Sequence, residues 1–137
     1  MTLVLDASMA VAWLFDDEHT GGTAEALRRV VAEGAIVPSL WRLEVANLLR
    51  NAMRRGRCDE EYVDRSLDRL WRLPITVDSE TDAAAWGATR ALARELGLTL
   101  YDAAYLEVAK RLGLTLASCD QALLIGAAAS GVETLPK

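Results

Sequence analysis

The segment Leu3-Val4-Leu5-Asp6-Ala7-Ser8 decides the fold class of this chain. Its three apolar residues are typical of a short strand in a parallel sheet, where both faces of the strand are buried. Asp6 follows the strand directly, and helical sequence begins near Ser8. A strand that leads straight into a helix is the first half of a βα unit. The segment therefore predicts an α/β protein with a carboxylate at the end of its first strand.

The alternation of short apolar runs and longer helical patterns continues along the chain. Further strands are predicted at residues 35–37, 75–77 and 114–117, with an edge strand at 132–135. Helices are predicted at residues 25–33, 40–53, 59–71, 79–97, 99–113 and 121–129. No stretch rich in Gly, Ser or Pro divides these elements. We expect one domain, residues 1–137, with a short parallel sheet flanked by helices.

Composition restricts the class of protein further. Of the 137 residues, 52% are hydrophobic and 26% charged, which is typical of a globular chain with its own core. Cys58 and Cys119 form no CxxC motif, and with a single His they are too few for a zinc site. The N-terminus lacks the pattern of a signal peptide, and no apolar run approaches the roughly 20 residues of a membrane helix. We expect a cytoplasmic protein that does not bind membranes.

Charge indicates how nucleic acid would be bound. The net charge of -5 argues against binding through an overall positive field. Arginine is nevertheless clustered around one helix end, at Arg50, Arg54 and Arg55. These side chains could form an ordinary solvated helix face or a local phosphate-binding surface.

Four carboxylates are predicted to converge at one edge of the sheet. Asp6 ends the first strand, and Asp120 lies three residues beyond the strand at 114–117. Glu44 lies early in the helix after the second strand, and Asp102 lies in a first helical turn. Ligands of open parallel sheets bind beyond the carboxyl ends of the strands.

Such a carboxylate cluster would be repulsive without a cation, and oxygen ligands favour Mg²⁺ or Mn²⁺. A metal-bound water can act as a nucleophile on a phosphodiester. The cluster therefore predicts metal-dependent phosphodiester hydrolysis.

Each of these acids also has a purely structural interpretation. Asp6 could cap the helix that begins near Ser8, and Asp120 could cap the helix at 121–129. Glu44 could be an exposed helix residue, and Asp102 could complete a capping box with Thr99. The tryptophans fall on apolar helix faces, which favours core or dimer packing over base stacking. They are Trp13, Trp41, Trp71 and Trp86.

Four short motifs together resemble those of PIN-domain toxins of the VapC type, and they span almost the whole chain. They are Leu5-Asp6-Ala7-Ser8, Val37-Pro38-Ser39 leading to Glu44-Val45-Ala46-Asn47, Leu98-Thr99-Leu100-Tyr101-Asp102-Ala103, and Leu116-Ala117-Ser118-Cys119-Asp120. Each motif is weak alone, but their order and spacing are specific.

The resemblance implies a PIN-like sandwich and an endoribonuclease that cuts structured RNA such as transfer or ribosomal RNA. It also implies which residues serve the site. Asp6, Glu44, Asp102 and Asp120 match the acidic, metal-binding catalytic positions of the family. Ser8 matches a hydroxyl residue that orders the site, Ser118 stands where the family commonly has threonine, and Asn47 matches a polar position beside the site.

The resemblance further implies a homodimer and a VapB-type antitoxin. The C-terminal segment of the antitoxin would block the site, and its N-terminal domain would bind operator DNA, so this chain would meet DNA only indirectly. A dimer would place two acidic pockets beside one RNA-binding groove. Arg50, Arg54 and Arg55 are the candidates for phosphate contacts in that groove.

Other classes of protein fit the sequence less well. Aspartyl phosphotransfer needs a second acid in a DxD pair, which Asp6-Ala7-Ser8 lacks, and a receiver domain also needs a late lysine that Lys110 and Lys137 do not supply. The remaining alternative is a catalytically silent PIN-fold module that dimerises or holds an antitoxin. A metal titration would distinguish that module from an enzyme.

Overall fold

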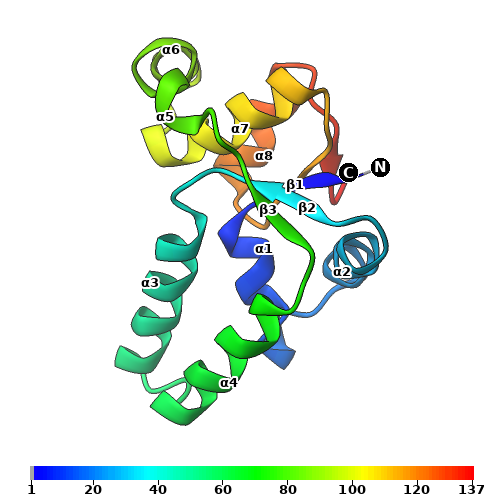
Figure 1. The fold of residues 1–137 in the computed structure, drawn as a ribbon, viewed down its shortest axis with the longest axis vertical. Helices are drawn as coiled ribbons and strands as arrows, with labels where there is room; N and C mark the ends of the chain where they lie inside the picture. The colour runs from blue at the N-terminus through cyan, green and yellow to red at the C-terminus, as the bar shows by residue number, and fades with distance from the viewer. Residues whose placement is uncertain (1) are drawn as a thin grey trace.

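The computed structural model describes residues 2–137, which contain one parallel sheet of five short strands in the order β3-β2-β1-β4-β5 (Figure 1). The strands are β1 (Leu3–Leu5), β2 (Ala35–Val37), β3 (Ile75–Val77), β4 (Leu116–Ala117) and β5 (Thr134–Leu135). The predicted α/β class is confirmed. The bounds of the first three strands match the prediction, and the last two strands are shorter than predicted.

The strand order reverses beside β1. In the sheet β1 is central and pairs with β2 on one side and β4 on the other, in the registers Leu3↔Ala35 and Val4↔Leu116. The chain runs from β1 outward to β2 and β3, and then returns to place β4 on the opposite side of β1. Such a reversal is the usual place for a ligand site in open α/β sheets.

Helices connect the strands. Their bounds are α1 (Ala7–Ala12), η1 (Asp16–Glu18), α2 (Gly21–Glu33), α3 (Trp41–Arg54), α4 (Glu60–Trp71), α7 (Leu100–Leu112) and α8 (Gln121–Ala129). The second helix begins before the predicted Glu25 because Thr20 and Thr23 form a reciprocal capping box. None of the helices within residues 2–137 has the length and apolar character needed to cross a bilayer.

The single helix predicted at residues 79–97 is three segments in the structure. They are α5 (Thr81–Ala84), a π-helical turn η2 (Ala85–Thr89) and α6 (Arg90–Leu96). A π turn holds more residues than an α turn and so redirects the side chains around it, which a 3.6-residue pattern does not anticipate. Trp86 in this turn is 88% exposed, and Trp71 is 70% exposed, whereas Trp41 is 3% exposed. Of the expected core or dimer packing, core packing is confirmed for Trp41. Trp71 and Trp86 lie outside the core, and dimer packing stays a prediction for them.

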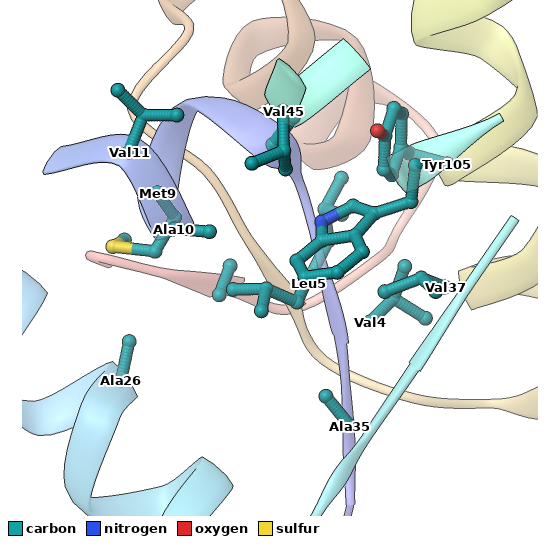
Figure 2. Close-up of a cluster of buried hydrophobic side chains, with 14 of the residues drawn as sticks. Val4, Leu5, Met9, Ala10, Val11, Ala26, Ala35, Val37, Val45 and Tyr105 are labelled. Carbon is teal, nitrogen blue, oxygen red and sulfur yellow. The ribbon is translucent and has the colours of Figure 1, made fainter. Parts of the chain in front are cut away.

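The core lies around the central strand. Leu3, Val4 and Leu5 are fully buried, and side chains from α1, α3 and α7 pack around them (Figure 2). Helix α3 packs against α1 and continues into α4, and these two form a hairpin that extends away from the sheet in Figure 1. Helix α7 packs against β1 and β4. Both α3 and α7 are thus fixed relative to the carboxyl end of β1.

Candidate active site

A pocket of about 170 Å³ lies at the carboxyl end of the central strand. It is lined by Asp6, Ala7, Ser8, Glu44, Asn47, Leu48, Asp102 and Asp120. All four carboxylates that the sequence singled out therefore share one pocket. A larger apolar hollow of about 240 Å³ lies between α3 and α4, but no carboxylate lines it. The larger hollow is therefore not the acidic site.

The four acids come from four different elements. Asp6 follows β1, and Asp120 follows β4 as the residue before α8. Glu44 lies in the first turn of α3, and Asp102 lies in the first turn of α7. Because β1 and β4 are parallel neighbours, their carboxyl ends meet at one edge, and the first turns of the two helices reach the same edge.

Two serine hydroxyls hold the Asp6 carboxylate. Ser8 Oγ donates to Asp6 Oδ2 at 2.5 Å, and Ser118 Oγ donates to the same oxygen at 2.7 Å. Ser118 is fully buried and its Oγ also accepts from the backbone N–H of Asp120 at 3.0 Å. Asp6 makes no side-chain cap of α1, so the capping interpretation of this residue is wrong. The hydroxyls instead join the ends of β1 and β4.

Glu44 is held by Tyr105 of α7, a residue that the sequence patterns did not single out for the site. The Tyr105 hydroxyl donates to Glu44 Oε1 at 2.5 Å, although the two residues are 61 positions apart. Glu44 is partly buried, so its interpretation as an exposed helix residue is wrong. The available signal was the spacing of Tyr105 from Asp102, since residues three apart share a helix face.

The other two acids lie beside helix caps. Asp120 Oδ1 accepts from the backbone N–H of Leu123 at 3.1 Å, so its capping role is confirmed alongside its place in the pocket. Thr99 Oγ1 accepts from the backbone N–H of Asp102 at 3.1 Å. A full capping box also needs the Thr99 backbone N–H to donate to the Asp102 carboxylate, and this second hydrogen bond is not formed between these described residues. The Asp102 carboxylate therefore keeps a place in the pocket.

Burial and mutual repulsion make Asp6, Glu44 and Asp102 difficult to ionise. Burial raises the pKa of Asp6, and the charge of Asp120 adds to that rise, while the serine hydrogen bonds offset part of it. Burial likewise raises the pKa of Glu44, with the Tyr105 bond opposing and the charges of Asp6 and Asp102 adding. The pKa of Asp102 is raised from 3.8 to about 6 by burial and then by Asp120 and Asp6. The pocket would be stabilised by positive charge.

The donor set fits a hydrated divalent cation. No Lys or Arg lines the pocket within residues 2–137, so the chain supplies no compensating charge there. Within the same residues, no three acidic, His or Cys side chains are close enough to enclose an ion on their own. An ion that retains several waters and uses one or two direct carboxylates suits this spacing, which is the usual behaviour of Mg²⁺.

The candidate RNA-contacting arginines lie outside the pocket. Arg50 and Arg54 are exposed on α3, and Arg55 is the exposed residue at its end. None of the three forms an ion pair with an acid in the described part of the chain. Arg57 differs, because it pairs with Asp17 and Glu18 at 2.8 Å. The three unpaired guanidinium groups remain available to phosphate.

Together the fold and the pocket define an α/β protein with an acidic site at the reversal point of a parallel sheet. The PIN domain family model matches residues 3–127. The chain belongs to the PIN domain family, and the predicted resemblance to its VapC-type members is confirmed.

Relatives and solved structures agree with this assignment. Ribonuclease VapC3 of Pyrobaculum aerophilum is 34% identical over 125 residues, which cover 90% of this chain and 92% of that protein. The crystal structure of PAE2754 from Pyrobaculum aerophilum has a TM-score of 0.66 and 24% identity, covering 99% of this chain and 90% of that one. Mycobacterium tuberculosis VapC20, described as a sarcin-ricin loop cleaving toxin, has a TM-score of 0.62 and 16% identity, covering 96% of each chain.

Proposed function

We propose that the protein is a Mg²⁺- or Mn²⁺-dependent endoribonuclease and the toxin of a toxin-antitoxin pair, which hydrolyses phosphodiester bonds in structured RNA such as transfer or ribosomal RNA. The observation that carries the proposal is the convergence of four carboxylates from four elements in one pocket with no basic residue in its lining. The relative named as a ribonuclease supports the reaction. The neighbour named as a sarcin-ricin loop cleaving toxin supports an RNA target.

In this proposal the residues of the chain bind and orient. Asp6, Glu44, Asp102 and Asp120 would hold the cation, one or two of them directly and the others through its bound waters. When bound, the cation would lower the pKa of a coordinated water, which favours its deprotonation to the nucleophile, and the cation would also neutralise charge that develops on the scissile phosphate. Ser8 and Ser118 support the site by holding Asp6 Oδ2, which fixes the orientation of this carboxylate. Asn47 is exposed at the pocket wall, where its amide can hydrogen bond to RNA.

RNA binding would use a different surface from the reaction. The acidic pocket repels phosphate unless a cation is bound, so affinity for the RNA backbone must come from nearby basic groups. Arg50, Arg54 and Arg55 meet this need because they are exposed and carry no acidic partner among residues 2–137. They extend from α3, the helix that also bears Glu44.

The same pocket offers a means of control by a protein partner. A guanidinium group from an antitoxin of the VapB type would pair with these carboxylates and occupy the place of the cation. We extend the proposal to such an antitoxin, to a homodimer that sets two pockets beside one groove, and to DNA contact only through the antitoxin.

The test is incubation of the purified, antitoxin-free protein with total cellular RNA in Mg²⁺, in Mn²⁺ and in EDTA. Discrete fragments are expected with either metal and none with EDTA. Asp102→Asn should remove the fragments. Asp64→Asn, at an exposed position on α4 outside the pocket lining, should cut like the wild type. A folded Asp102→Asn protein with full activity would refute the site. Absence of cleavage by the wild type in both metals would favour the silent module.

A further inference from the structure

Three carboxylates of the pocket share an arrangement in which a protein donor holds one oxygen. Asp6 Oδ2 accepts from two serines, Asp120 Oδ1 accepts from the Leu123 backbone, and Glu44 Oε1 accepts from Tyr105. Three of these donors are close to their acceptor in sequence or follow the adjacent strand: Ser8, Ser118 and the Leu123 backbone. Tyr105 is different, because it reaches from one helix to another.

Tyr105 lies where its ring packs in the core and its hydroxyl contacts Glu44. Tyr105 lies one turn after Asp102 on α7, and it is fully buried in the core cluster that includes Val45 of α3 (Figure 2). A phenylalanine ring would fill the same space, so packing alone does not require the oxygen. A buried tyrosine hydroxyl needs a partner, and here the partner is a pocket carboxylate rather than a backbone carbonyl.

Tyr62 provides an internal comparison. Its hydroxyl donates to the backbone carbonyl of Leu14, between α4 and the segment after α1. That bond connects two parts of the scaffold and touches no residue of the pocket. The Tyr105 bond connects α7 to Glu44, and Glu44 Oε2 has no hydrogen bond from any residue of the described chain, 2–137. One oxygen of Glu44 is thus fixed and the other is left for a ligand.

We propose that Tyr105 is a positioning residue of the metal site: its hydroxyl fixes Glu44 Oε1, and this sets Oε2 at the pocket to bind a divalent cation or a water of its hydration shell. The inference rests on the proposed function in that it takes Glu44 as a metal-binding residue. Without the hydroxyl, the Glu44 side chain can adopt more rotamers, and metal binding must then restrict it to one of them. Loss of such outer contacts typically weakens metal binding about 10- to 100-fold.

The experiment measures Mn²⁺ affinity of the purified full-length chain, without RNA, by calorimetric titration and by the electron paramagnetic resonance signal of free Mn²⁺. The variants are Tyr105→Phe, Glu44→Gln, the double variant, and Tyr62→Phe as the matched control. Tyr105→Phe should bind Mn²⁺ about tenfold more weakly, and the double variant should bind no more weakly than Glu44→Gln alone. Tyr62→Phe should bind like the wild type, although it also loses a hydroxyl bond.

A second variant tests the same contact with the tyrosine intact. Glu44→Asp shortens the side chain by one methylene and withdraws the carboxylate from the Tyr105 hydroxyl, so it should also weaken Mn²⁺ binding. Thermal unfolding in EDTA of Tyr105→Phe and Tyr62→Phe, compared side by side, checks that both remain folded.

Several results would overturn the inference. It fails if Tyr105→Phe binds Mn²⁺ like the wild type, if its tenfold loss persists in the Glu44→Gln background, or if Glu44→Gln itself leaves affinity unchanged. Failure of the proposed function gives a different result: a wild-type protein that binds Mn²⁺ but cuts no RNA. In that event the Mn²⁺ affinities of the variants still show whether Tyr105 acts through Glu44.

Discussion

Replacing Asp102 with asparagine should stabilise the metal-free protein at pH 7, even though it removes a proposed metal ligand. The wild-type carboxylate is partly buried beside Asp6 and Asp120, and its pKa is raised from 3.8 to about 6. Asparagine has nearly the same shape and carries no charge. The variant therefore keeps the packing and removes the repulsion.

The magnitude follows from the pKa. A rise from 3.8 to about 6 corresponds to about 3 kcal/mol, since one pH unit is worth about 1.4 kcal/mol. Water screens the partly exposed Asp102, so we retain about half of that value. The charge also favours the N-terminus of α7 by about 0.5 kcal/mol, which asparagine loses. The net expectation is a gain of about 1 kcal/mol, or about 3 to 5 °C in Tm.

The pH dependence has a definite sign. Because the folded pKa of Asp102 lies above the unfolded value, the folded state gains stability as pH falls from about 6 toward 4. The raised pKa values of Asp6 and Glu44 act in the same direction. Burial alone would raise the pKa of Asp78, but its hydrogen bonds with Arg111 more than offset this and lower it, so its stabilisation is lost only below about pH 4.

The assay is thermal unfolding in EDTA between pH 4 and 7, with Asp64→Asn as the control. Asp102→Asn should exceed the wild type in Tm at pH 7, and the difference should shrink toward pH 4. Added Mn²⁺ should then raise the Tm of the wild type more than that of the variant, because ligand binding stabilises the folded state that binds it. A variant that melts at or below the wild-type temperature at pH 7 in EDTA would show that repulsion in the pocket does not strain the fold.

Two further perturbations test the surroundings of the pocket. Ser118→Ala removes a donor to Asp6 and the acceptor of the Asp120 backbone N–H. It should therefore lower the free energy of unfolding, measured by urea denaturation, by about 2 kcal/mol. An unchanged free energy of unfolding would contradict this role of Ser118. The double variant Arg50→Glu with Arg54→Glu, made in the inactive Asp102→Asn background, should weaken RNA binding. The slope of the logarithm of RNA affinity against the logarithm of salt concentration should become shallower by about 1 to 2. Arg28→Glu with Arg29→Glu on α2, which changes the net charge by the same amount, is the control, and equal losses in both proteins would assign the effect to net charge.

Much of the fold could be predicted from local patterns. The bounds of β1, β2 and β3 match because short apolar runs between helical segments identify buried parallel strands. The four acids were found because each adjoins a strand end or a helix start, and such positions converge in a parallel sheet. The break of the helix at 79–97 was not found, because a π turn leaves no mark in a 3.6-residue period.

The sequence by itself determined the α/β class and the convergence of Asp6, Glu44, Asp102 and Asp120 at one edge, because both depend on the local order of strands, helices and acids. The tertiary structure alone decided which strands are neighbours and how each carboxylate is held. Periodicity shows that Tyr105 faces inward, but not that its hydroxyl meets a residue 61 positions away on α3. That contact exists because α7 packs on the sheet while α3 packs on α1, and packing between distant segments is a property of the whole fold.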